Sequence, residues 1–114
     1  MPEFKRSRRV SELLREEISR IITQQLKDPL VGIVTVTSVN LTDNLKLARV
    51  YVSILGDEKN RQNGLRGLER ATKFIRSELA RRTNLKYVPE LEIYYDETID
   101  YAQNIEALLK QIHK

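Results

Sequence analysis

The sequence contains no cysteine, no tryptophan and only one histidine, His113, which stands next to the last residue. Without cysteine the chain can form no disulfide, thiolate nucleophile or sulfur-ligated zinc or iron-sulfur site. A single histidine at the terminus argues against a Ser-His-Asp triad and against a multi-histidine metal site. We therefore expect a protein without a metal, a cofactor, a small-molecule substrate or an enzymatic activity.

Long hydrophobic runs are also lacking. No stretch approaches the roughly 18 apolar residues of a membrane span, and the basic N-terminus leads into an amphipathic pattern instead of a signal peptide's apolar run. A chain of 114 residues, 40% hydrophobic and 32% charged, has room for one hydrophobic core. We expect a single cytoplasmic domain over residues 1–114, and a monomer.

Acidic residues are scarce in the first three quarters of the chain. Residues 1–88 hold 18 basic and 10 acidic side chains, a balance of +8, whereas residues 89–114 hold 2 and 6, a balance of −4. A positive field attracts polyanions, of which nucleic acid is the commonest in the cytosol. The alternative is a soluble domain whose basic charge serves no partner.

Helical periodicity comes first along the chain. Apolar residues follow one helical face over residues 8–27, with Ser7 or Ser11 as a candidate N-cap and Asp28-Pro29 as the stop. Residues 1–7 then form a flexible basic arm. The cationic cluster at this end consists of Lys5, Arg6, Arg8 and Arg9. These side chains either contact phosphates or are merely solvated.

The period then changes from helical to alternating. Residues 31–40 and 45–55 are rich in β-branched residues and predict a β-hairpin. A loop over 42–44 would place Val36 opposite Val50 and Thr37 opposite Arg49, which gives one dry and one wet face. A two-residue loop would mix the faces, so we prefer the longer one.

A second helical segment, residues 58–83, should form two pieces. Leu68, Ala71, Ile75 and Leu79 share one side, and the opposite side is cationic. Residues 70–86 contain six Lys or Arg and one acid. A face that only keeps the protein soluble usually mixes both signs, so we expect contacts to a nucleic acid from Arg66, Arg70, Lys73, Arg76, Arg81, Arg82 and Lys86.

Residues 91–95 alternate as a third strand, and residues 99–112 carry the stripe of a last helix. The order of elements favours an α+β fold, with helices on one face of a three-stranded sheet and a further C-terminal helix. Asp96, Glu97 and Asp100 are expected to cap this helix, although paired carboxylates can also serve acid-base or metal chemistry. Tyr51 and Tyr94 could stack on bases or simply cover the sheet.

Two segments resemble the bacterial ribosome-binding factor A family: KDPLVGIVTVTSVNLTDNLKLARVYVSILGDE (27–58) and GLERATKFIRSELARRTNLKYVPELEIYYDETIDYAQNIEALL (67–109). The resemblance implies a type II KH-like domain that binds the 30S ribosomal subunit and its 16S rRNA. It also implies a role in late 30S maturation and 16S rRNA 5′-end processing, most important in the cold. A protein-interaction adaptor whose basic face binds an acidic partner remains the alternative.

The chain departs from the family at one motif. The family has an Ala-x-Gly kink in place of the GxxG loop of other KH domains, and the matching residues here are Ala71, Thr72 and Lys73. Because glycine loosens a helix by about 1 kcal/mol relative to alanine, the lysine leaves two alternatives open. Either Lys73 brings its ammonium to a phosphate at the kink, or it is solvated on a straight helix.

Overall fold

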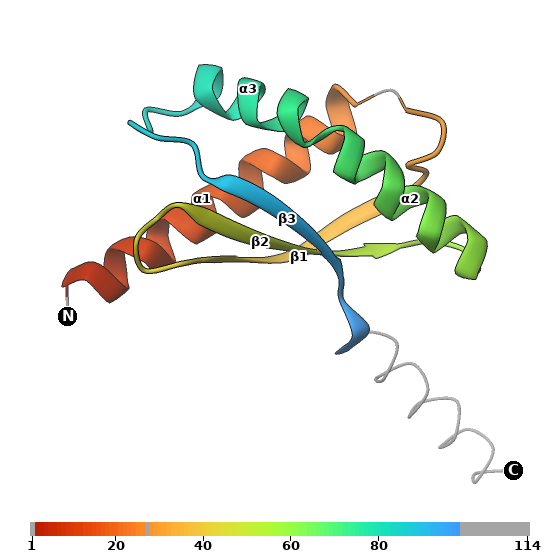
Figure 1. Ribbon diagram of the computed structural model, residues 1–114, viewed down its shortest axis with the longest axis horizontal. Coiled ribbons are helices and arrows are strands. Elements are labelled where there is room, and N and C mark those ends of the chain that lie inside the picture. The colour runs from red at the N-terminus through yellow and green to blue at the C-terminus, as the bar shows by residue number, and fades with distance from the viewer. Residues whose placement is uncertain (1, 27, 99–114) are drawn as a thin grey trace, which may run out of the picture.

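The computed structural model of the protein describes residues 2–26 and 28–98. Three helices and three strands follow one another along this part of the chain (Figure 1). They are α1 (Pro2–Gln24), β1 (Val34–Leu41), β2 (Leu47–Ile54), α2 (Glu58–Arg70), α3 (Thr72–Arg82) and β3 (Glu90–Tyr95). The predicted last helix, 99–112, lies outside the described residues.

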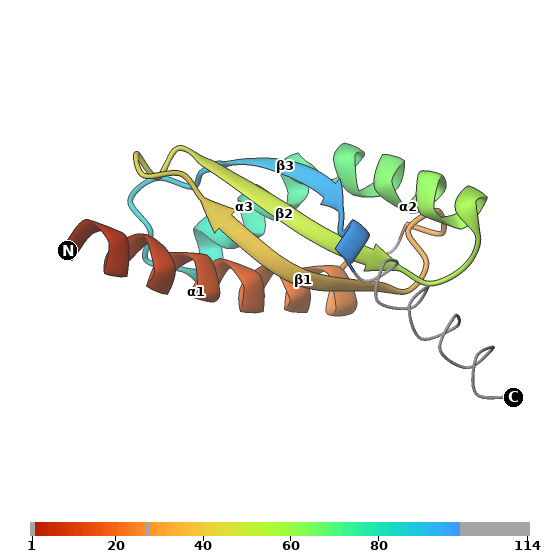
Figure 2. The same cartoon turned by 90° about the horizontal axis from the view of Figure 1, so that it is seen from below.

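The sheet has the order β1-β2-β3, with β1 and β2 antiparallel and β2 and β3 parallel. A parallel pair needs a crossover, which α2 and α3 provide. Seen from below in Figure 2, the sheet lies in front of α1, α2 and α3, so the three helices cover one face. This confirms the predicted α+β fold.

The hydrophobic core lies between that face and the helices. Alternate residues of β2 are buried, and the predicted stripe of α2 and α3, from Leu68 to Leu79, is buried as well. Each large apolar side chain removed from water stabilises the fold by about 1.5–3 kcal/mol. The side chains with no exposed surface at all are Leu14, Ile18, Ile21, Ala48, Val50, Val52, Leu68, Ile75 and Leu79.

Helix α1 is longer at its start and shorter at its end than the sequence predicted. It begins at Pro2, a residue whose fixed φ suits the first helical turn, so the arm predicted for residues 1–7 is helical from residue 2. The N-cap prediction is wrong, because Ser7 and Ser11 both lie inside the helix. The Ser11 hydroxyl instead accepts a hydrogen bond from the Leu41 amide at 3.2 Å. The helix ends at Gln24, before the turn at Asp28.

The predicted hairpin is present, but its predicted register is wrong. Val36 pairs with Val52 instead of Val50, and a bulge at Thr37 shifts the pairing so that Val39 faces Val50. The bulge adds one residue to β1, which keeps Val36 and Val39 on the buried face although they are three residues apart. The prediction assumed uninterrupted alternation.

The prediction that residues 58–83 form two pieces is confirmed. Asp57 caps α2 through a capping box, in which its carboxylate accepts from the Asn60 amide at 2.9 Å while the Asn60 side chain accepts from the Asp57 amide at 3.0 Å. The break falls at Ala71.

In the described part of the chain, no helix has the length and apolar character needed to cross a membrane.

Candidate nucleic-acid interface

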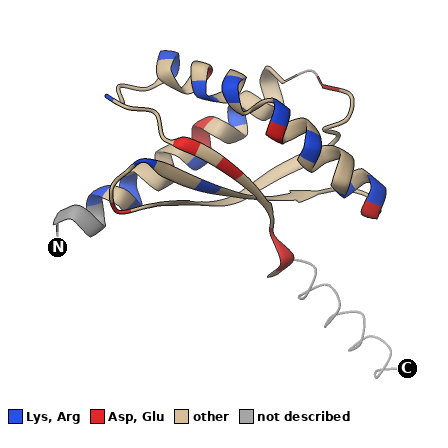
Figure 3. Ribbon diagram, in the orientation of Figure 1, with Lys and Arg blue, Asp and Glu red and all other residues tan. Residues whose placement is uncertain are grey.

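Lys and Arg residues recur along α1, α2 and α3, whereas acids mark β3 and the segment after it (Figure 3). The amphipathic character of α2 and α3 causes this arrangement, because Leu68, Ala71, Ile75 and Leu79 turn toward the core, whereas Arg66, Arg70 and Lys73 face water. The structure thus has a cationic helical side, as the sequence predicted.

Three of the predicted contacts are fully available to a ligand. Arg66, Arg70 and Lys73 are exposed, and within the described residues none of their side chains has a hydrogen-bond or ion-pair partner. They flank the break between α2 and α3. A guanidinium in this state can give its whole donor fork to a phosphate.

The helix break itself forms although a lysine replaces the family's glycine. Ala71 has φ −86° and ψ 0°, and its amide donates to both Gly67 O at 3.1 Å and Leu68 O at 3.0 Å. The Thr72 hydroxyl donates to Glu69 O at 2.9 Å, which satisfies a carbonyl freed by the break. Lys73 is exposed on the first turn of α3, so its ammonium stands beside the break.

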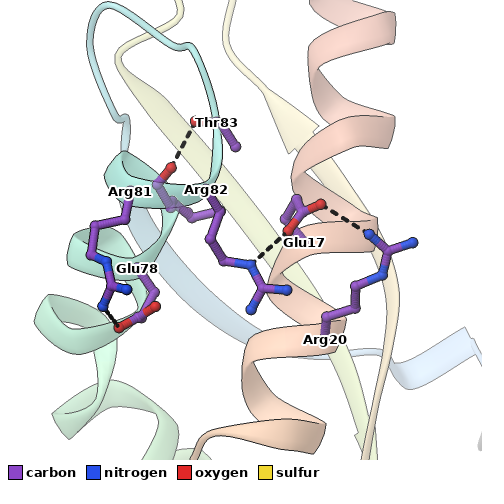
Figure 4. Close-up of polar contacts among 7 residues, drawn as sticks. Glu17, Arg20, Glu78, Arg81, Arg82 and Thr83 are labelled. Atoms are coloured by element: carbon purple, nitrogen blue, oxygen red, sulfur yellow. Dashed lines mark hydrogen bonds and ion pairs between the residues drawn. The ribbon is translucent and has the colours of Figure 1, made fainter.

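Three arginines near the end of α3 and on α1 are held by two largely buried carboxylates, those of Glu17 and Glu78 (Figure 4). Glu17, only 12% exposed, bridges Arg82 Nε and Arg20 Nη1 at 3.0 Å each, and thereby links α1 to α3. Arg81 donates to Glu78, a buried residue, at 3.1 Å. Because each carboxylate fixes the orientation of its arginine, these side chains are pre-organised, but part of their charge is neutralised.

The sequence could have suggested the Glu17-Arg20 pair, since these residues stand three apart on a predicted helix. It could not have paired Arg82 with Glu17, because that contact depends on how α3 crosses α1. The link that Glu17 makes between Arg20 and Arg82 was therefore not predicted.

Arg76 has a different role from the one predicted. Its Nε and Nη2 donate to Pro89 O and Val88 O at 3.0 Å each, and its Nη1 lies 3.3 Å from Glu90. The guanidinium therefore closes the loop between α3 and β3 with its own donors. Nothing in this geometry presents the side chain to RNA as a free cation.

The remaining predicted cations lie at the other end of the molecule. Arg6, Arg8 and Arg9 are exposed on the first turns of α1, and Lys5 belongs to the same helix. Lys86 is exposed after α3, and its Nζ lies 5.6 Å from the centre of the Tyr87 ring. A second cationic area thus accompanies the one at the helix break.

The open face of the sheet is polar. Tyr51 and Tyr94 stack on each other with ring centres 5.6 Å apart, and Arg49 lies 3.7 Å from Glu92. The Tyr94 hydroxyl donates to Glu92 at 2.8 Å, and this hydrogen bond raises the pKa of Tyr94. The aromatic rings are thus engaged with each other and a carboxylate.

Asp96 makes structural hydrogen bonds. Its carboxylate accepts from the Thr37 hydroxyl at 2.6 Å and from the Thr98 amide at 3.0 Å, and these bonds lower its pKa. The helix that Asp96 was predicted to cap lies outside the described residues, as does Asp100, so the capping role stays a prediction. Across residues 2–26 and 28–98, no three His, Cys, Asp or Glu side chains form a group that could hold a metal ion.

Comparison with known proteins identifies the family. The family model of ribosome-binding factor A matches residues 6–109. The chain is 51% identical over 109 residues to ribosome-binding factor A of Macrococcus caseolyticus, covering 96% of both chains. It is 50% identical over 108 residues to that of Natranaerobius thermophilus, covering 95% of this chain and 82% of the relative.

Solved structures agree in fold. The crystal structure of ribosome-binding factor A from Thermus thermophilus matches with a TM-score of 0.71 and 29% identity, over 78% of this chain and 93% of that one. A homology model of the Thermus thermophilus factor, fitted into a cryo-EM map of a 30S-RbfA complex, matches with a TM-score of 0.65 and 30% identity, over 76% and 91%. The chain belongs to the ribosome-binding factor A family.

Proposed function

We propose that this protein binds the 30S ribosomal subunit through its 16S rRNA, as a monomer in the cytoplasm, and assists late 30S maturation and 16S rRNA 5′-end processing. The observation that carries the proposal is the set of unpaired cations at the helix break, Arg66, Arg70 and Lys73. The relative fitted into a map of a 30S complex supports the same partner.

The mechanism is electrostatic docking onto folded RNA. Unpaired cations contact phosphates and release counterions, while Arg81 and Arg82, held by Glu78 and Glu17, offer guanidinium edges in fixed orientations. Phosphate contacts carry no base information, so specificity comes from the shape of the rRNA and from neighbouring ribosomal proteins. We expect no RNA cleavage by the protein itself.

The test compares two double variants that remove the same charge. Arg70→Gln with Lys73→Gln neutralises the helix break, and Arg49→Gln with Lys59→Gln neutralises two exposed cations elsewhere. Binding to purified 30S subunits and to protein-free 16S rRNA is measured across a salt series. The first variant should bind more weakly, with the slope of log affinity against log salt shallower by about 1.5–2.

The control variant should keep both the affinity and the slope. Equal losses in the two variants would mean that only net charge matters, which would refute the break as the site. Binding to subunits without any binding to protein-free 16S rRNA would favour the adaptor alternative, an acidic protein partner. In cells, removal of the protein should lead to 16S rRNA with unprocessed 5′ ends, measured by primer extension.

A further inference from the structure

A groove of about 810 Å³ lies at the end of the molecule where the start of α1, the β1-β2 loop and the α3-β3 loop meet. Its volume is within the range of small-ligand sites. The cations at the helix break, Arg66, Arg70 and Lys73, do not line it. Its apolar lining comes from three separate segments and includes Val10, Leu41, Leu45, Leu85 and Val88.

The charge around this groove is strongly positive. Its described lining contains Arg6, Lys46, Arg76 and Lys86 but a single acid, Glu90, and that acid is paired with Arg76 at 3.3 Å. The other three cations have no carboxylate partner among the described residues. The groove therefore combines an apolar surface with an excess of positive charge, which fits a ligand that is both flat and anionic.

Tyr87 supplies an aromatic surface at the same place. It is 76% exposed, the largest exposed fraction among the large hydrophobic residues described, and Lys86 Nζ lies 5.6 Å from its ring centre. An aromatic ring next to an ammonium can stack on a base while the ammonium contacts the adjoining phosphate. Unlike Tyr51 and Tyr94, this ring is not stacked on another aromatic ring of the described chain.

The loop between β1 and β2 holds one residue in a strained conformation against the groove. Leu45 has φ +62°, a left-handed conformation that residues with a Cβ atom disfavour, although it is not glycine. The Thr42 carbonyl accepts from the Leu45 amide at 2.9 Å, and the Asn44 side chain accepts from the Lys46 amide at 3.0 Å. Such strain persists where the surrounding contacts enforce it and is concentrated at binding sites.

We propose that this groove binds an unstacked nucleotide of single-stranded RNA, with the base on Tyr87 and the apolar lining and the phosphates on Lys46, Lys86 and Arg6. The inference rests on the proposed function only in that the ligand is RNA. A duplex cannot use the site, because its bases are stacked inside the helix. An acidic peptide would satisfy the charge but would leave the exposed ring without a flat partner.

The experiment measures fluorescence anisotropy of a labelled uridine hexamer and of a labelled twelve-base-pair RNA duplex at low salt. Tyr87→Ala should weaken binding of the hexamer between about fivefold and about 100-fold and leave binding of the duplex unchanged, whereas Tyr87→Phe should bind like the wild type. Lys46→Gln with Lys86→Gln should make the salt slope for the hexamer shallower by about 1.4. The control is Tyr94→Ala, on the open face of the sheet, which should keep the affinity for the hexamer.

Thermal melts by circular dichroism check that each variant is folded. Because Tyr87 is exposed, its variants should melt like the wild type. An unchanged affinity of Tyr87→Ala for the hexamer would overturn the proposal. So would tighter, Tyr87-dependent binding of an alternating Glu-Leu octapeptide, which would assign the groove to a protein partner. If wild-type protein binds 30S subunits but hexamer binding ignores Tyr87, the groove fails and the proposed function stands. If hexamer binding depends on Tyr87 but the wild-type protein does not bind 30S subunits, the groove proposal stands and the proposed function fails.

Discussion

Substitution of Arg76 should separate a structural arginine from an RNA-binding one. The Arg76 guanidinium donates to Val88 O and Pro89 O, and Pro89 is buried. A hydrogen bond from a charged donor stabilises a fold by about 1.5–3 kcal/mol. Because the side chain is 34% exposed, water replaces part of the lost contact, and we take the lower end of that range for each bond.

The ion pair with Glu90 adds little. Glu90 is 72% exposed, and an ion pair of this kind contributes at most about 1 kcal/mol. Arg76→Gln should therefore lower the free energy of unfolding by about 3–4 kcal/mol. For a domain of this size, this corresponds to a fall in Tm of about 12–16 °C.

The assay is urea unfolding followed by circular dichroism, with Arg70→Gln and Glu90→Gln as controls. Arg70 is exposed and has no partner among the described residues, so its variant should unfold within about 0.5 kcal/mol of the wild type. Glu90→Gln should lose at most about 1 kcal/mol. If Arg76→Gln is as stable as Arg70→Gln, the hydrogen bonds from Arg76 to the Val88 and Pro89 carbonyls do not stabilise the fold. That result would refute the structural role of Arg76.

Two further predictions concern α1 and Asp96. Ile18 is fully buried at the centre of α1, so Ile18→Ala should cost about 2–5 kcal/mol in urea unfolding, and a cost below 1 kcal/mol would mean that α1 is not packed on the sheet. Since hydrogen bonds from Thr37 and Thr98 lower the pKa of Asp96 in the folded protein, its carboxylate stabilises the fold above its unfolded pKa of about 3.9, and this stabilisation is lost as the pH falls through the lowered value. Asp96→Asn should thus cost about 1 kcal/mol at pH 7 and lose less stability than the wild type between pH 5 and pH 2. Parallel losses in the two proteins would show that Asp96 is not the titrating group.

The sequence predicted what depends on period and composition. The amphipathic stripes of α1, α2 and α3, the strand at 91–95 and the wet face bearing Arg49 follow from the alternation of apolar and polar residues, because burial imposes that alternation. The hairpin register could not be predicted in the same way. It depends on the bulge at Thr37, and the contact that accompanies the bulge is made by Asp96, far along the chain.

The same distinction applies to the site residues: their exposure could be predicted from helical period, but their tertiary partners could not. Exposure of Arg66, Arg70 and Lys73 follows from helical period, and the structure agrees. The roles of Arg76 and Arg82 depend on tertiary partners, the carbonyls before β3 and Glu17 of α1. Those contacts cannot be predicted from the separation of the residues along the sequence. Arginines that are equivalent in the charge pattern therefore differ in what they can bind.

The two cationic areas differ in the kind of RNA that they suit. Around the helix break, Arg66, Arg70 and Lys73 are exposed on the outside of α2 and α3, which favours contact with phosphates on the outside of a folded RNA. At the groove, cations surround an apolar hollow with an exposed ring, which favours a base that has left its stack. If both proposals hold, an RNA that joins a folded helix to a single strand and reaches both areas should bind more tightly than either part, because the second contact becomes intramolecular. We therefore expect the tightest binding to RNA at the border of a helix and an unpaired segment.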